Sequence, residues 1–129
     1  MSELNNVVTA AGTYNSIPTS LTSNASVVNI IEGLTITKSA DKTNWTNGNL
    51  TYTIILENKA EYTYEKPIVT DIIDTTLVDF IEGSVTINNA TATTSQYNYD
   101  TGTHTLTINL EDVMPSASTT LTFQVKKKA

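Results

Sequence analysis

Two ionisable side chains, Lys38 and Asp71, stand where an alternating pattern otherwise places apolar residues. Lys38 continues the inward-facing series of Leu34 and Ile36, and Asp71 lies between two aliphatic residues of the same face. A lone charge in a protein core costs several kcal/mol unless it is paired or neutralised. We therefore expect Lys38 and Asp71 to form a hydrogen-bonded ion pair or to be held in neutral form.

The other residues that could act in catalysis or metal binding form no recognisable active-site pattern. The single histidine, His104, has no Ser/Asp partners near it, and the five glycines include no phosphate-binding loop. One acidic set lacks the spacing of a calcium-binding loop, and we expect it to be solvated: Asp71, Asp74, Asp79 and Glu82. We predict no enzymatic activity, no cofactor and no metal.

The composition favours strands and excludes several classes of partner. Hydrophobic residues make up 39% and charged residues 16% of the 129 residues, which suits one domain with an appended arm. Threonine and asparagine are abundant, so we expect almost no helix. The net charge of −6 argues against nucleic acid, and the basic run at residues 126–128 predicts a solvated tail.

Features that the sequence lacks bear on the cellular compartment of the protein. Without cysteine, neither disulfides nor thiolate metal sites can form. No apolar stretch is long enough to span a membrane. Residues 1–6 lack the features of a signal peptide, so we expect either that a signal was removed or that the protein leaves its cell by another route. Assembly inside a spore-forming mother cell, released by lysis, is one such route.

Alternation of apolar and polar residues dominates the chain. An Asp-Thr-Gly turn at residues 100–102 predicts a hairpin. With no helix between the strands, the spacing predicts a sandwich of two antiparallel sheets. The predicted strands are residues 33–38, 50–58, 67–74, 83–88, 96–99, 103–110 and 119–126, preceded by weaker candidates at 6–14 and 21–31.

Three blocks resemble a bacterial Ig-like repeat, the conserved domain of unknown function numbered eleven, which is common in cell-surface, S-layer and spore-surface proteins. They are LTITKSAD at residues 34–41, NGNLTYTIILEN at 47–58 and IVTDIID at 68–74. The sequence departs from the repeat where Asn49 replaces an acidic residue and Asp74 replaces proline. The resemblance implies an Ig-like antiparallel β-sandwich.

In tandem members of this family, two further strands close each module before the next one begins. Here similar segments stand at the head instead, NVVTAAGTY at residues 6–14 and SNASVV at 23–28. The resemblance thus implies an arm, residues 1–31, and a sandwich, residues 32–129, that lacks its closing strands. We expect the arm to supply one or two strands to a neighbouring copy, with Asn6, Val8, Ala10, Val27 and Val28 as donor-strand residues; Asn6, Val8 and Ala10 share one inward-pointing face. Closure of the arm on its own domain and a disordered arm remain the alternatives.

Many related surface domains carry a self-formed isopeptide bond between a first-strand lysine and a late asparagine, assisted by a carboxyl group. The resemblance implies Lys38 as nucleophile, Asp71 as proton shuttle and Asn6 of a neighbour as acceptor, with Asn58 as a fallback acceptor within the same domain. An apolar pocket would favour the neutral amine and the protonated carboxyl group. The simpler alternative is the ion pair alone.

The function predicted from these features is a self-assembling subunit of an extracellular bacterial fibre, such as a spore appendage or a pilus-like filament. Its partners would be other copies of itself. The alternative is an adhesin or ligand-binding module of a larger surface protein, with the arm folded back on its own domain.

Overall fold

The computed structural model describes residues 2–128. They form thirteen strands and no helix, and therefore no segment able to cross a membrane as a helix. The all-β prediction is confirmed. The chain divides into two units at Glu32 and Gly33, one residue beyond the predicted boundary. They are called the arm and the body, and each is described on its own.

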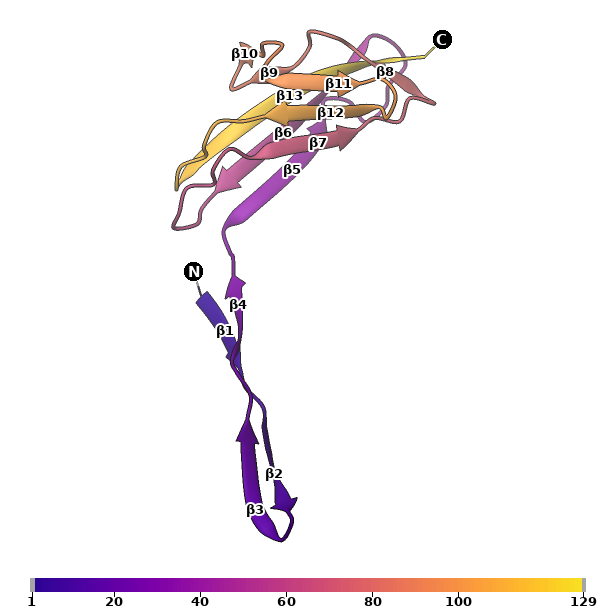
Figure 1. Ribbon diagram of the computed structural model, residues 1–129. Helices are drawn as coiled ribbons and strands as arrows, with labels where there is room; N and C mark the ends of the chain where they lie inside the picture. Colours follow the sequence, from indigo (N-terminus) through magenta and orange to yellow (C-terminus); the bar gives the residue numbers. More distant parts are fainter. Residues whose placement is uncertain (1, 129) are drawn as a thin grey trace. The chain divides into compact units, whose positions relative to one another are not determined.

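The arm is a two-stranded antiparallel ribbon (Figure 1). Its turn is formed by Asn15 and Ser16, whose φ angles of 48° and 66° suit a two-residue hairpin turn. The two weak strands predicted here are in fact four strands that pair with each other, because a lone strand would leave its amides without partners. They are β1 (Ser2–Asn6) with β4 (Ser26–Ile30), and β2 (Thr9–Tyr14) with β3 (Ile17–Thr22).

The larger sheet of the body is built around one long antiparallel pair. Strand β13 follows β6 over ten residue pairs and also pairs with β8 and β9. The order is β10-β9-β13-β6-β5, with β8 beside β13. The strands are β5 (Leu34–Ala40), β6 (Asn49–Asn58), β8 (Val78–Phe80), β9 (Thr86–Ile87), β10 (Ala90–Thr91) and β13 (Ala117–Lys127).

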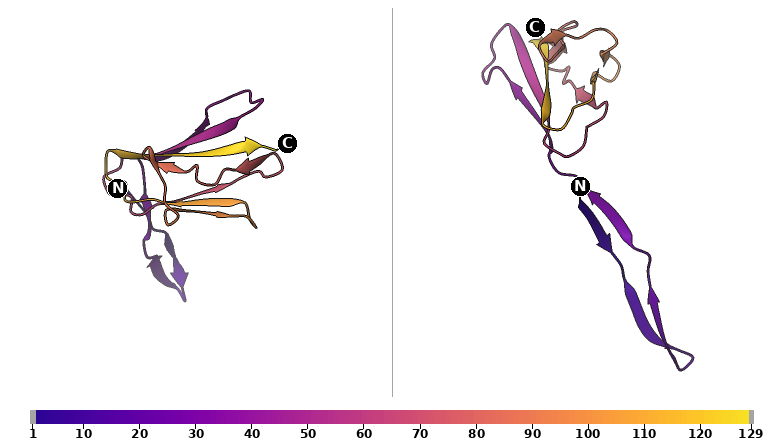
Figure 2. Two further views of the ribbon diagram at one scale, coloured as in Figure 1. Left: turned by 90° about the horizontal axis from the view of Figure 1, so that it is seen from above. Right: turned by 90° about the vertical axis from the view of Figure 1, so that its left-hand side faces the viewer.

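The smaller sheet has the order β11-β12-β7 and forms the second layer of a sandwich-like body (Figure 2). Its strands are β7 (Ile68–Ile72), β11 (Tyr97–Asp100) and β12 (Thr105–Asn109). The predicted hairpin is confirmed, since Asp100 pairs with Thr105 across the turn. As a result β5 is an edge strand of one sheet and β7 an edge strand of the other.

The core lies between the two layers. Phe123 is fully buried and contacts the rings of Tyr52 and Phe80, at centroid distances of 5.3 and 6.3 Å. Period-two alternation selected most of the inward residues correctly, because both sheets have one apolar face. The most deeply buried aliphatic residues are Leu106, Ile108, Leu121, Val85, Val113 and Val125.

Two details of the body differ from the sequence-based expectation. The predicted strand at residues 83–88 is reduced to β9, because the N–H and hydroxyl of Ser84 donate back to Ile81 O and close a turn at residues 81–84. The lysines at the end are not only a solvated tail. Lys126 and Lys127 belong to β13 and pair with β8, and Lys128 lies 3.5 Å from the Asp79 carboxylate.

Candidate functional site

Lys38 and Asp71 meet across the two sheets, as predicted. Lys38 Nζ on β5 donates to Asp71 Oδ2 on β7 over 2.7 Å. The ammonium group also lies 4.3 Å from the ring centroid of Tyr52 and 5.7 Å from that of Phe123. The side chain of Asp71 is 13% exposed and that of Lys38 is 43% exposed. The pair is therefore formed, but the lysine is open to solvent on one side.

The inner face of β5 is half-buried at Leu34 and exposed beyond it. Ile36 pairs with Leu56 and so points toward the core, yet Ile36 is 58% exposed. No described strand pairs with β5 on the side away from β6, or with β7 on the side away from β12. We call these two free edges, with Leu34, Ile36 and Lys38 between them, the open side of the body. An open side is costly because it leaves apolar surface and backbone groups to water.

Asn58 does not lie near Lys38. It pairs with Leu34, whereas Lys38 pairs with Ile54, four residues away or about 13 Å along the strand. The amide of Asn58 is 1% exposed and fully engaged. Its Nδ2 donates to the carbonyl groups of Val113 and Tyr62, and its Oδ1 accepts from Ala60 N–H, at 2.8 to 2.9 Å. This geometry assigns Asn58 to holding a loop, and the fallback acceptor has no access to the lysine.

The arm has one apolar face because its second strand carries one extra residue. Asn6 pairs with Ser26 and Thr9 with Thr22, so two residues of the first strand lie opposite three of the second. This bulge shifts the alternation of the second strand by one. By alternation, large apolar side chains from both halves then share one face, the apolar arm face: Leu4, Val8, Tyr14, Ile17, Leu21, Val28 and Ile30.

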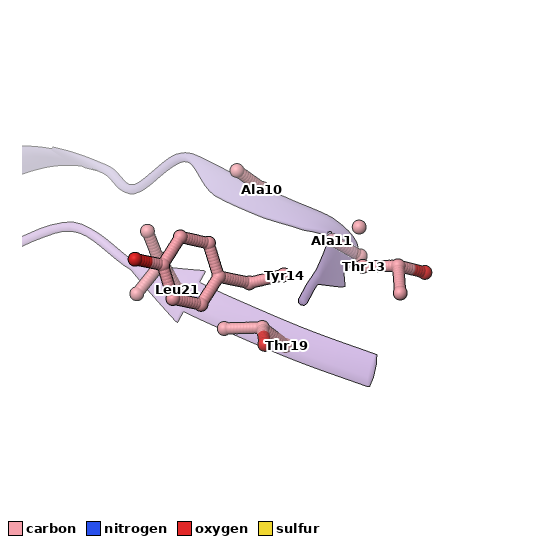
Figure 3. A pocket seen from close by; sticks show the side chains of 7 residues that line it. Ala10, Ala11, Thr13, Tyr14, Thr19 and Leu21 are labelled. Atoms are coloured by element: carbon pink, nitrogen blue, oxygen red, sulfur yellow. The ribbon is translucent and has the colours of Figure 1, made fainter. Parts of the chain in front are cut away.

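These seven side chains are between 39% and 78% exposed. Near the tip of the ribbon, Tyr14 and Leu21 line a shallow hollow, while Thr13 points away from them (Figure 3). The opposite, mainly polar arm face carries Glu3, Asn5, Thr9, Thr13, Ser20, Thr22 and Asn29, together with Val27 and Pro18. We call it the polar arm face. The arm therefore presents an amphipathic surface whose apolar side is uncovered.

The predicted arm residues divide between the two faces. Val28 pairs with Leu4 on the apolar arm face, and Ala10 pairs there with Leu21. Val27 pairs with Asn5 and points to the opposite face. Sequence reasoning missed Leu21 and Ile17 on the apolar arm face, because the bulge changes the alternation between them and Val28. Asn6 pairs with Ser26 and is the one asparagine on this face among the described paired residues.

The remaining candidates are separated from one another. Asp74 accepts from the hydroxyl of Thr76 and also from its backbone N–H, and these bonds hold the pKa of its carboxyl group below the ordinary value. Glu82 accepts from the hydroxyl of Tyr97. His104 lies in the β11–β12 turn with a φ of 58°. Within residues 2–128, no three histidine or carboxylate side chains are placed to hold a metal ion.

No protein-family model, curated protein or solved structure matches the chain. Its function is therefore inferred from its own residues and geometry.

Proposed function

We propose that the chain is a self-assembling structural subunit of an extracellular bacterial fibre, a spore appendage or pilus-like filament. The arm of one copy completes the sandwich of the next. The observation that carries this proposal is that one chain exposes both an apolar arm face and the apolar inner face of an edge strand. Each surface has the chemistry to cover the other.

The Ig-like resemblance supports the same arrangement. In an Ig-like sandwich, one sheet contains the order C-F-G, and the other begins with strand A. Strands β5, β6 and β7 correspond in order to A, B and C, and the free edge of β7 is where an F strand would pair. A two-stranded arm has the right number of strands to act as F and G. The extracellular surface location follows from this resemblance.

Exchange between copies is favoured over closure within one chain by the short connection. Only three residues separate β4 from β5. A G-like strand would run parallel to β5, and parallel neighbours need a crossover of roughly a dozen residues. A contact that uses the arm of one copy and the open side of another is heterologous, so it propagates without closing. A filament is the expected product.

We further propose a covalent lock at the Lys38–Asp71 pair. With the arm of a neighbour in place, the neutral Lys38 amine attacks Cγ of the neighbour's Asn6. The C–N bond of the carboxamide breaks, ammonia leaves, and Asp71 carries the proton from the amine to the departing nitrogen. The contact between Lys38 and Asp71 and the adjacent rings of Tyr52 and Phe123 support this role. Covering the open side would remove the remaining water from the lysine.

Assembly is tested by electron microscopy of the full chain and two variants. Val27 and Val28 are neighbours on β4, 54% and 53% exposed, and lie on opposite arm faces. V28E places a charge in the interface and should abolish fibres, whereas V27E places it in water and should retain them. A wild-type protein that stays monomeric and monodisperse would contradict the proposal and favour a self-closed binding module.

A further inference from the structure

In β7, every second residue points its backbone N–H and C=O groups toward the free edge of the sheet. Ile73 N–H donates to His104 O, and Leu110 N–H donates to Pro67 O, at opposite ends of the β7–β12 pairing. In antiparallel strands hydrogen-bonded pairs alternate, so residues 67, 69, 71 and 73 bond toward β12. Ile68, Thr70 and Ile72 therefore point their N–H and C=O groups to the free edge. Their side chains lie on the outer face, where Ile68 and Ile72 are 65% and 74% exposed.

The free edge of β5 has the opposite relation between backbone and side chains. Lys59 N–H donates to Gly33 O, and Asp41 N–H donates to Thr51 O. Residues 33, 35, 37, 39 and 41 therefore bond toward β6. The residues that point their amides to the free edge are 34, 36, 38 and 40, whose side chains lie on the inner face.

At the outer edge of the arm, as at the free edge of β7, the residues whose backbone groups point outward carry their side chains on the face away from the apolar one. Ser23 N–H donates to Val8 O, so Val8 and the even-numbered residues of β2 bond within the arm. Thr9, Ala11 and Thr13 point their amides outward. Their side chains belong to the polar arm face. The backbone groups available for pairing and the polar side chains thus come from the same residues.

These relations between backbone and side-chain direction favour one of the two free edges, that of β7, for antiparallel pairing with the arm. Residues that exchange hydrogen bonds across an antiparallel pair have side chains on the same face. On β7, Thr9, Ala11 and Thr13 would join the outer face, and the apolar arm face would turn inward. Antiparallel pairing with β5 would instead bury the polar arm face. A register shift of one residue between the arm and β7 would likewise bury the polar arm face.

We propose that the arm of a second copy adds antiparallel to the free edge of β7, through the edge formed by β1 and β2. This inference rests on the proposed function and names the acceptor strand, the donor edge and the buried face. The β1–β2 edge is assigned because Asn6 lies on the apolar arm face and needs a polar partner when buried. Such partners, Lys38 and Asp71, lie on the open side, with Asp71 on β7 itself.

Charge and area agree with a second copy as the occupant. The apolar arm face carries no charged side chain, and the charges of Lys38 and Asp71 are already paired. A standard interface buries roughly 800 Å² per partner, and the exposed side chains of the apolar arm face would contribute to that area. No unpaired charge would be trapped.

The test uses two proline variants of the full chain. In T70P the lost N–H points away from β12, so the small sheet keeps its internal bonds. In A40P the lost N–H points away from β6, at the other free edge. Under the same conditions, T70P should show no fibres by electron microscopy and A40P should form them. Circular dichroism and thermal melting must show that both variants are folded.

A second measurement covers the case in which T70P does not fold. Amide hydrogen exchange of wild-type protein should show that Ile68, Thr70 and Ile72 become protected on assembly, whereas the amide of Ala40 changes less. Fibres from folded T70P, or unprotected β7 amides in wild-type fibres, would overturn the assignment of the edge. If V28E still abolishes fibres in that case, the proposed function stands without this docking mode. If wild-type protein forms no fibres, the proposed function itself fails.

Discussion

Ile36 and Leu56 are direct cross-strand partners on the inner face of the larger sheet, yet Ile36 is 58% exposed and Leu56 is 5% exposed. The two side chains have the same hydrophobic character and face the same way. They differ in burial because β6 has a strand on each side, β13 and β5, whereas β5 is an edge strand with one free side. The core of the body therefore ends one strand before the sheet does.

This difference predicts unequal effects of truncation. Leu56→Ala should destabilise the subunit by about 2–5 kcal/mol, as expected for a buried leucine. Ile36→Ala should cost the isolated subunit less than about 1 kcal/mol, because most of the side chain is already in water. In the fibre, Ile36→Ala should lower the temperature of disassembly. Urea denaturation of the subunit and thermal disassembly of the fibre measure the two effects.

If Ile36→Ala destabilised the isolated subunit as much as Leu56→Ala does, Ile36 would already be covered within a single chain. That result would favour an arm closed on its own domain.

A conservative substitution of Lys38 distinguishes the proposed isopeptide bond from a simple ion pair. Lys38→Arg retains a positive charge next to Asp71 but removes the nucleophilic amine, since guanidinium stays protonated. Wild-type fibres should give a ladder that resists boiling detergent, and each bond should lower the intact mass by one ammonia. Lys38→Arg should give fibres that dissociate to monomers. Wild-type fibres of unmodified mass would reduce the pair to an electrostatic contact.

Asn58 is expected to act in stability rather than in linkage. Removing its amide takes this partner from the Tyr62 carbonyl and the Ala60 N–H and leaves the Val113 carbonyl with Tyr64 N–H alone, so Asn58→Ala should cost about 2–3 kcal/mol in the free energy of unfolding. Asn98, an exposed strand residue, is a suitable control and should change by less than about 0.5 kcal/mol on mutation to alanine. The detergent-resistant ladder should persist in Asn58→Ala. Loss of the ammonia mass change from folded Asn58→Ala protein would make Asn58 the acceptor.

Alkaline pH should lower the free energy of unfolding of the body, because two of its tyrosines have raised pKa values. Burial raises the pKa of Tyr97, and its hydrogen bond to Glu82 raises it further. Burial also raises the pKa of Tyr99, with Asp79 adding to the effect. A folded-state pKa above the unfolded value of about 10 means that this stabilisation is complete below pH 10 and is lost as pH rises through the folded-state pKa. Denaturant midpoints measured between pH 8 and 12 should fall above pH 10, and fall less in Tyr97→Phe. An equal fall in both proteins would contradict this origin.

Much of the body could be predicted from alternation, because strands buried on one face have a period of two. The inward residues of β6, β12 and β13, and the pairing of Lys38 with Asp71, follow from it. Exposure of Ile36 could not be predicted this way, since a period identifies the face of a residue but not the neighbour that covers it. Strand β13 extends beyond the predicted residues 119–126 at both ends, to Ala117 and Lys127. Lys127 lies outside the predicted strand because it is polar, although its backbone pairs with Val78 of β8.

The arm was predicted less well for a different reason. One extra residue near Asn24 reverses the alternation of the second strand, so Val27 and Val28 exchange faces relative to a regular strand that begins at Ile17. A bulge of this kind depends on what lies opposite, here Val7 and Val8, and leaves no periodic signal in its own segment.

Mixing two assembly-deficient full-length variants tests the central claim most directly. V28E has a defective arm and an intact acceptor edge, whereas T70P has an intact arm and a blocked acceptor edge. Each should be monomeric alone, and the mixture should give a one-to-one complex and no fibres, measured by size-exclusion chromatography with light scattering. Two variants that remain monomers when mixed at concentrations where wild-type protein forms fibres would contradict exchange of the arm between copies.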